Sequence, residues 1–282
     1  ISIGTGNEGA ARGHASGYLQ QGIEREVEFA ISNYETVMNL QIWKSYVDEY
    51  DISVSGPSGQ TVGPIQKTQG PQRFVLGQTE LLVYYGEPSP YSPYQEIYID
   101  FIPVKTYMDA GIWTIILVPR KIVRGNYDMW MPGQSVLNEG TGFLNPVEET
   151  TLTIPSTAAK VISVGAYDSR NDQLADFSGR GFTRQTNEVK PDLAAPGVNI
   201  LSTAPGGGYV VRSGTSMATP FVTGSAALLM QWGIVNGNDA FLYGEKIKAY
   251  FLRGARHLPV LREYPNRQIG WGALCVRDSL PE

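Results

Sequence analysis

The residues best suited to do chemistry lie in one short segment, SGTSMATP at residues 213–220. A turn of small residues leads there into an Ala- and Gly-rich stretch that is typical of a buried helix. Ser216 would lie near the positive end of the helix dipole, and Gly214 would let a substrate backbone approach closely. The pattern predicts a nucleophilic serine. It also fits a serine that only caps the helix, which is a common role for serine at this position.

Several segments of the chain resemble the subtilisin-like serine peptidases. GTSMATP at residues 214–220 resembles the nucleophile motif of that family, and GNEG at residues 6–9 resembles the segment with its oxyanion-hole asparagine. KPDLAAPG at residues 190–197 and VISVGA at residues 161–166 also resemble family segments, the latter followed by Phe177, Ser178 and Gly181. These segments occur in the family's order, in residues 1 to about 13 and about 151–282.

The resemblance implies a role for individual residues and a protein or peptide substrate. Ser216 would attack the scissile carbonyl and form an acyl-enzyme. Asn7 would donate its amide to the oxyanion, beside the backbone N–H of Ser216; losing such a donor costs about 10²–10³ in turnover, a figure that comes from subtilisin. Gly4, Thr5 and Gly6 would form one wall of the pocket for the side chain preceding the cut. Without the resemblance, Asn7 fits a turn, since asparagine tolerates a left-handed backbone.

The catalytic Asp and His of that family have no counterpart in this sequence. In the family both precede the asparagine segment, the histidine within an HGTH-like motif, whereas this chain opens ISIGTGN. His14 could replace the base, but its position after Asn7 favours a polar loop residue, and His257 is expected at a surface or a helix end. Losing the base costs about 10⁶ in turnover, again a figure from subtilisin. We therefore expect the chain alone to be inactive and the missing N-terminal half to be its partner.

An alternative is a catalytically dead pseudopeptidase that binds a protein through an inserted domain. The missing half would normally cover part of the central sheet, so we also expect an exposed sheet edge and exposed apolar surface.

The elements that must position these residues fall into three zones. Residues 1 to about 20 indicate a strand and a Gly-rich turn, and residues about 22–137 alternate apolar with polar residues, which predicts an antiparallel β-sandwich. Residues about 150–282 mix buried strands, at 161–166 and 196–201, with helices from Ser216 and from Glu245 to Arg253. The predicted fold class is α/β. A subtilisin-like layered parallel sheet, the C-terminal half only, would comprise residues 1–20 and 145–282, interrupted by a β-sandwich or jelly-roll insert at 21–144.

The strands expected in the insert cover residues 27–31, 38–43, 50–55, 74–76, 80–85, 96–102, 113–118 and 127–131. An insert between Asn7 and Ser216 resembles the clostridial Csp germination proteases, which carry a jelly roll there. That resemblance rests on the Trp43 strand with SGPSG at 55–59, AGIWT at 110–114 and GNYDMW at 125–130. It implies a role in germination and a spore or cell-envelope location.

The aromatic residues of the insert allow a rival function, a carbohydrate-binding or adhesion fragment. Exposed tryptophans could stack on sugars, but tryptophan is highly buried on average, which favours a core role for Trp43, Trp113 and Trp130. A tyrosine-rich stretch indicates a hairpin with an aromatic face or an edge that docks a partner. Its members are Tyr84, Tyr85, Tyr91, Tyr94 and Tyr98.

Composition narrows the remaining function classes. The 282 residues carry a formal net charge of −5, which disfavours a nucleic-acid partner. No apolar run reaches the roughly 18 residues that a membrane span needs, so no membrane partner is expected. The single cysteine, Cys275, excludes an internal disulfide and a cysteine-built zinc site. No cofactor is expected. Relatives often hold calcium, but the loop with Asp168, Asp172 and Asp176 has no EF-hand pattern and fits solvated carboxylates.

Overall fold

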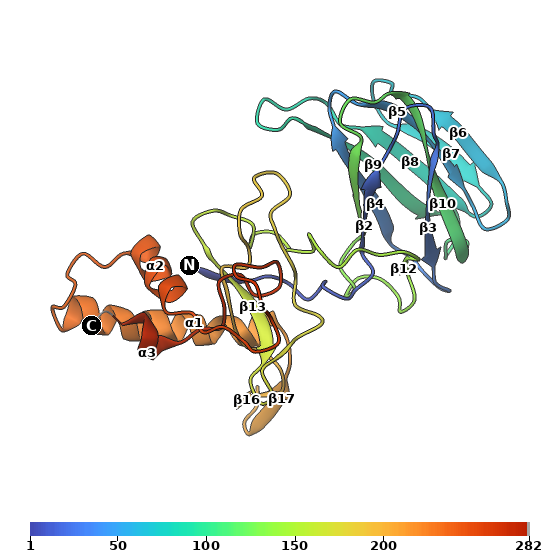
Figure 1. Ribbon diagram of the computed structural model, residues 1–282. Helices are drawn as coiled ribbons and strands as arrows, with labels where there is room; N and C mark the ends of the chain where they lie inside the picture. The colour runs from blue at the N-terminus through green and yellow to red at the C-terminus, as the bar shows by residue number, and fades with distance from the viewer. Residues whose placement is uncertain (281–282) are drawn as a thin grey trace. The chain divides into compact units, whose positions relative to one another are not determined.

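The computed structural model describes residues 1–280 of the chain, which divides into two compact units (Figure 1). Unit 1 consists of Ile1–Ala10 and Glu148–Glu282, and unit 2 consists of Ala11–Val147. The first boundary therefore comes earlier than the predicted residue 20. Residues 14–18 form a strand that pairs with residues 126–130 of unit 2, and this pairing draws the segment into the insert.

Unit 2 is built from strands in two antiparallel sheets, a five-stranded sheet of order β12-β3-β10-β5-β6 and a six-stranded sheet of order β2-β11-β4-β9-β8-β7. The strands are β2 (His14–Tyr18), β3 (Arg25–Ile31), β4 (Met38–Ser45), β5 (Glu49–Ser55), β6 (Thr61–Ile65), β7 (Gln72–Leu76), β8 (Thr79–Tyr85), β9 (Tyr94–Pro103), β10 (Gly111–Lys121), β11 (Asn126–Trp130) and β12 (Gly142–Phe143). Figure 1 shows these strands as arrows.

One hydrophobic core holds the two sheets of unit 2 together. Buried and partly exposed residues alternate along β4 and β9, as a strand with one covered face requires. Phe29, Phe101 and Trp113 form edge-to-face aromatic contacts in this core, with ring centroids 5.4–5.8 Å apart. Burying each such side chain stabilises the fold by roughly 1.5–3 kcal/mol.

All eight strands expected in the insert are present, which confirms the period-2 interpretation of that zone. The sequence pattern did not indicate β2, β6 and β12. The first two have the sequences HASGY and TVGPI, in which Gly and Pro interrupt the alternation, and β12 is only two residues long. Register with a neighbouring strand defines these three.

Unit 1 contains a small sheet, a separate hairpin and the helices (Figure 1). Its elements are β1 (Ser2–Gly4), β13 (Ile162–Asp168), β14 (Gln173–Leu174), β15 (Leu193–Pro196), β16 (Ile200–Thr203), β17 (Tyr209–Arg212), α1 (Thr215–Met230), the π-helical turn η1 (Gln231–Val235), α2 (Gly244–Arg253) and α3 (Val276–Ser279).

Parallel pairing organises the sheet of unit 1, because β13 pairs in parallel with both β1 and β15. Strand β13, which is buried except at Asp168, and helix α1 share a core that includes Val164, Leu193, Ala218 and Val222. Small side chains such as Ala218 let the helix pack closely on the strands. The predicted α/β class with a parallel sheet, combined with antiparallel sheets in the insert, is confirmed.

The strand expected at residues 196–201 is split in two by Gly197. The chain leaves β15 at Pro196 and enters β16, part of the two-stranded β16–β17 hairpin, at Ile200. A Cβ atom at Gly197 would lie 2.6 Å from the Cβ of Ala166 and 3.0 Å from the carbonyl oxygen of Gly214. The turn therefore requires glycine, and it brings the strand end against the start of α1.

Helix α1 and its continuation η1, Thr215–Val235, are long and apolar enough to cross a membrane by length and composition alone. This differs from the expectation that no apolar run is long enough, because serine, threonine and glycine interrupt the run without making it strongly polar. The core helix of a soluble protein passes the same test, so the finding is weak evidence for a membrane role.

Candidate active site

The two residues predicted to act on a peptide bond meet at one edge of the unit 1 sheet. Asn7 follows β1, and Ser216 is the second residue of α1. Gly197 follows β15 and Gly214 precedes α1, and the two residues meet at the same edge. The Gly214 N–H donates there to the carbonyl oxygen of Gly197 at 2.8 Å. The carboxyl ends of parallel strands are the usual place for a site in an open α/β sheet.

Thr215 holds the side-chain amide of Asn7 in one orientation. The side-chain oxygen Oδ1 of Asn7 accepts from the Thr215 backbone N–H at 3.0 Å and from Thr215 Oγ1 at 3.2 Å. Thr215 Oγ1 in turn accepts from the backbone N–H of Gly6 at 3.2 Å. Because a backbone N–H can only donate, Oδ1 faces the helix and the Nδ2 group is left to donate elsewhere. Thr215 is therefore a positioning residue for Asn7.

Gly214 makes the turn that presents Ser216. Its φ of 151° lies in the region that L side chains rarely adopt, and a Cβ atom there would approach Asn7 Nδ2 to 3.3 Å. Gly214 and Thr215 are buried, whereas Ser216 and Asn7 are exposed. The Ser216 hydroxyl has no hydrogen-bond partner within residues 1–280, and the positive end of α1 lies beside it. An exposed serine beside a fixed amide donor is the arrangement that acyl transfer needs.

A shallow groove brings Ser216 together with Gly4. The groove has a volume of about 640 Å³, and its walls come from β1, Pro155 and α1, including Thr219 and Pro220. A Cβ atom at Gly4 would lie 2.9 Å from Thr215 Oγ1, so a side chain there would displace Thr215.

The other two residues predicted for the pocket wall are placed differently from Gly4. Thr5 is fully buried, with its Oγ1 3.5 Å from the Oγ of Ser178. Gly6 is half-buried, and its backbone N–H is used by Thr215. The side chain of Thr5 therefore packs in the interior, and only its backbone could face a substrate. Strand alternation explains the difference, because neighbouring residues of an extended segment point to opposite faces.

Each of the two histidines has neighbours within its own unit. His14 belongs to strand β2 of unit 2, not to a loop, and it is buried there. Its Nδ1 lies 3.2 Å from the carbonyl oxygen of Val147, its Nε2 lies 3.2 Å from Asp128 Oδ1, and its ring stacks on Trp130. His257 is exposed and stacks on Tyr264 at 3.9 Å between centroids.

The loop carboxylates considered for calcium do not converge. Asp172 forms a bidentate ion pair with Arg256 at 2.8 and 2.9 Å, and Asp168 Oδ1 accepts from the backbone N–H of Arg170 at 3.0 Å. The Arg256 guanidinium lowers the pKa of Asp172 below its ordinary value. Among residues 1–280, no group of three or more His, Cys, Asp or Glu side chains is arranged to hold a metal ion.

A buried charge cluster supports the strands behind the site, in the KPDLAAPG segment. Asp192 Oδ2 accepts from Lys190 Nζ at 2.7 Å and from the backbone N–H of Ser163 at 2.7 Å. Asp192 Oδ1 forms an ion pair with Lys248 of α2, also at 2.7 Å. Burial is the largest cause that lowers the pKa of Lys190, the charge of Lys248 also lowers it, and Asp192 acts in the opposite direction. The cluster therefore joins β13, β15 and α2 through one carboxylate.

Sequence reasoning missed Thr215 and this cluster. Thr215 stands next to the predicted nucleophile, and its position at the start of the helix was the available signal. No local pattern indicates that Lys190, Asp192 and Lys248 share one contact, because Lys248 is far away in the sequence.

The tryptophans of unit 2 divide between core and surface. Trp113 is fully buried, and its Nε1–H donates to the carbonyl oxygen of Asp109 at 2.9 Å. Trp43 and Trp130 are half-buried on the other face of the six-stranded sheet. Trp113 is therefore a core residue and cannot stack on a sugar. Among the five tyrosines, Tyr85 is also buried, and Tyr91 is 92% exposed.

Comparison with known proteins identifies the family to which the chain is similar. Residues 125–272 match the model of the subtilase family. The chain is 38% identical to the serine protease AprX of Bacillus subtilis over 130 residues, which are 39% of this chain and 29% of AprX. It is 36% identical to the minor extracellular protease Vpr of Bacillus subtilis over 176 residues, which are 55% of this chain and 20% of Vpr.

The solved structure of the Clostridium perfringens CspB protease matches across both units. The TM-score is 0.91 at 38% sequence identity, and the match covers 99% of this chain and 58% of the CspB chain. The chain thus spans less than a third of the length of AprX and Vpr and somewhat more than half of the CspB chain.

Proposed function

Because this chain belongs to the subtilase family, we propose that it supplies the nucleophile and the oxyanion donors of a serine endopeptidase that hydrolyses peptide bonds in proteins. Ser216 Oγ attacks the scissile carbonyl carbon, the carbonyl oxygen becomes an oxyanion, and the hydroxyl proton passes to a base. The oxyanion receives hydrogen bonds from Asn7 Nδ2 and from the backbone N–H of Ser216.

The observation that carries this proposal is the double hydrogen bond from Thr215 to Asn7 Oδ1. It leaves Nδ2 as the outward donor without any reorganisation when substrate arrives. A donor that is already oriented stabilises a developing charge far more than one that must turn first. A helix-capping role for Ser216 alone would not need a fixed amide beside it, and the N-cap position of this helix is Gly214, not Ser216.

We further infer that the general base and its orienting acid come from a segment outside these 282 residues. Both ring nitrogens of His14 lie at oxygen atoms within unit 2, and His257 stacks on Tyr264, so neither is available as the base. The chain alone would then leave Ser216 a weak nucleophile. Its partner in catalysis would be the other half of a peptidase domain, which would also cover Ile1, Phe221 and Leu228, exposed beside β1 and along α1.

The resemblance of the insert segments to the clostridial Csp germination proteases supports three finer proposals. Unit 2 would be a jelly-roll insert, the substrate would be a protein processed during germination, and the location would be the spore or cell envelope. The alternative function is a pseudopeptidase, in which the parent protein lacks the base and unit 2 docks a partner.

Labelling with a fluorophosphonate probe tests the proposal. The full-length parent protein should be labelled at Ser216, the Ser216→Ala variant should not, and residues 1–282 alone should remain unlabelled. Labelling of the chain alone would contradict the inference that the base lies outside it. Absence of labelling in a folded full-length parent would reject the endopeptidase and leave the pseudopeptidase.

A further inference from the structure

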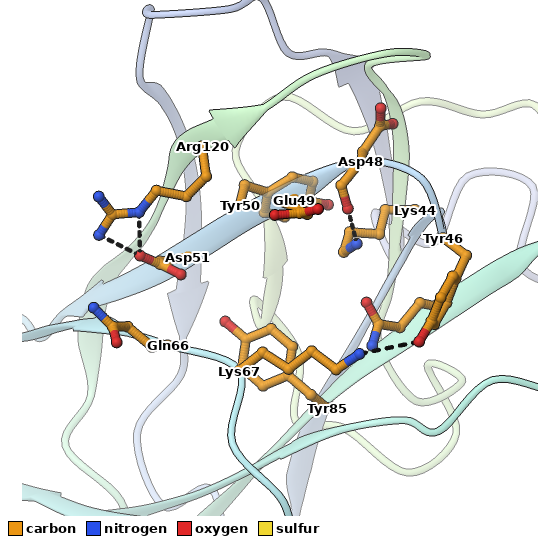
Figure 2. Close-up of a pocket in the computed structure, with 11 residues that line it drawn as sticks. Lys44, Tyr46, Asp48, Glu49, Tyr50, Asp51, Gln66, Lys67, Tyr85 and Arg120 are labelled. Carbon is orange, nitrogen blue, oxygen red and sulfur yellow. Dashed lines mark hydrogen bonds and ion pairs between the residues drawn. The ribbon is translucent and has the colours of Figure 1, made fainter.

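Unit 2 contains a cleft that the proposed peptidase chemistry does not use (Figure 2). Its volume is about 530 Å³, which is within the range of small-molecule sites and far larger than the roughly 30 Å³ of one water. The cleft opens where β4, β5, β8, β9 and β10 end or begin. Its lining residues are Lys44, Tyr46, Asp48, Glu49, Tyr50, Asp51, Gln66, Lys67, Tyr85, Gln95 and Arg120.

Two lysines face this cleft without a carboxylate partner. Lys44 is only 2% exposed, and its Nζ donates to the backbone carbonyl oxygens of Asp48 and Ser45. Lys67 Nζ donates to the hydroxyl of Tyr46 at 3.2 Å. Within residues 1–280, neither ammonium group forms an ion pair with a carboxylate. Figure 2 shows Lys67 reaching the hydroxyl of Tyr46 and Lys44 reaching Asp48.

The nearby carboxylates of Asp48 and Asp51 accept hydrogen bonds from groups other than the two lysines. Asp48 accepts three backbone N–H groups, from Val123, Arg124 and Gly125, at 2.7–2.9 Å. Asp51 is paired with Arg120 at 2.6 Å on the opposite side of the cleft, as Figure 2 shows. Asp48 and Asp51 are held by these partners, and neither carboxylate forms an ion pair with Lys44 or Lys67 within residues 1–280.

The two lysines also repel one another. The pKa of Lys44 is lowered to about 8, with burial as the largest cause and the positive charge of Lys67 as a further one. The charges of Asp48 and Glu49 act in the opposite direction without restoring the ordinary value. An anion between the two ammonium groups would relieve both the burial cost and the repulsion.

We propose that this cleft binds a small organic carboxylate, with its charge between Lys44 and Lys67 and its body against the tyrosine walls. The rings of Tyr46, Tyr50 and Tyr85 line the space, and an inorganic ion would fill only a small part of it. Charge-assisted hydrogen bonds from two ammonium groups supply the affinity for the anion. Glu49, which is exposed and forms no ion pair within residues 1–280, opposes the anion. The proposal does not depend on the peptidase activity.

Isothermal titration of residues 1–282 with 3-phenylpropanoate at pH 7 tests this proposal. The neutral isostere 3-phenylpropanamide and inorganic phosphate are the comparison ligands, and both should bind at least about tenfold more weakly, because one lacks the charge and the other the body. Equal binding of the amide would reject the anion site, and equal binding of phosphate would reject an organic ligand. Absence of measurable 3-phenylpropanoate binding by the folded chain would reject the proposal.

Single substitutions test whether the ligand binds in this cleft. Lys67→Met should weaken 3-phenylpropanoate binding about tenfold, and Glu49→Gln should tighten it. Lys105→Met, an exposed lysine of the same unit outside the cleft, is the matched control and should leave the affinity unchanged. Lys67 and Glu49 are both exposed, so these variants should fold, which a thermal melt checks. An unchanged affinity in Lys67→Met, or weaker binding in Glu49→Gln, would overturn the assignment.

The pH dependence gives an independent readout. The anion needs Lys44 in its charged form, so affinity should fall as pH rises through about 8. The charged and titratable groups that face Lys44 are Asp48, Glu49, Tyr46 and Tyr50 of the β4–β5 region, Asp51 with Arg120, Lys67 and Tyr85. In Lys44→Met the decrease near pH 8 should disappear, and its persistence there would contradict a site at Lys44.

Discussion

Asn7 Oδ1 accepts two hydrogen bonds from a single residue, Thr215, through its backbone N–H at 3.0 Å and its hydroxyl at 3.2 Å. Thr215 is the residue immediately before Ser216, so the proposed nucleophile and the support of its oxyanion donor belong to the same helical turn. Any movement of this turn would displace both together.

Replacing Thr215 with valine should reduce turnover without changing substrate binding. The variant loses the hydroxyl that bridges Gly6 and Asn7 and keeps the backbone N–H, so Nδ2 is less firmly aimed. We expect kcat of the full-length parent to fall about tenfold, as the loss of one hydrogen bond of roughly 1.4 kcal/mol would produce. KM should stay constant. Thr215→Ser, which keeps the hydroxyl, is the control and should retain most of the activity.

Asp192→Asn should strongly destabilise unit 1. The substitution leaves the buried ammonium group of Lys190 without its anionic partner and weakens the link to Lys248. Removing one member of a buried ion pair typically costs about 3–5 kcal/mol. Urea unfolding would measure the loss.

Asp172→Asn is the matched control for the buried cluster. Asp172 also pairs with a cation, Arg256, but both side chains of that pair are partly exposed. Its loss should cost about 1 kcal/mol or less, because water screens exposed pairs. Equal losses in the two variants would contradict a special role for burial at Asp192.

Trp113→Ala should unfold unit 2 or lower its free energy of unfolding by about 3–5 kcal/mol, since it empties a fully buried site. Trp43→Ala, at a half-buried position, should cost about 1–2 kcal/mol. Thermal unfolding monitored by circular dichroism would compare the two. If Trp113→Ala stayed fully stable and lost glycan binding, the core assignment would be wrong and the carbohydrate-binding alternative would return.

Local sequence patterns were enough to predict many of the strands and helices. The elements that they missed depend on long-range contacts. Alternation predicted β4 and β9, and the small residues after Ser216 predicted α1, because each pattern lies within one element. Strand β2 was missed because its HASGY sequence becomes a strand only by pairing with β11, and that pairing also moved the domain boundary. The same pairing buries His14, which sequence reasoning placed in a loop.

In the candidate active site too, local motifs predicted some residues, and long-range contacts placed the others. Family-like motifs singled out Ser216 and Asn7, and the structure brings them to one edge of the sheet. Thr5 was assigned to a substrate pocket with its neighbours Gly4 and Gly6, but alternation along the extended chain buries its side chain against Ser178. The cleft around Lys44 was not predicted, because its lining comes from five different strands and the connections between them.

The stability of unit 2 should depend on pH through Lys44. Burial lowers the pKa of this lysine in the folded protein from its ordinary 10.5 to about 8. Between these values the unfolded chain binds more protons than the folded chain, so the free energy of unfolding rises with pH across this window. The cost of burying the charge is therefore fully present below pH 8 and relieved by pH 10.5. The gain should be about 3 kcal/mol at most.

Urea unfolding at pH 7.5, 9 and 10.5 would measure this gain, and the wild type must be compared with Lys44→Met because tyrosines titrate in the same range. The difference in unfolding free energy between the two proteins should change in favour of the wild type as pH rises, since methionine carries no charge whose burial could be relieved. A difference that stays constant from pH 7.5 to 10.5 would mean that Lys44 keeps an ordinary pKa. The ammonium group would then be better solvated than its 2% exposure indicates.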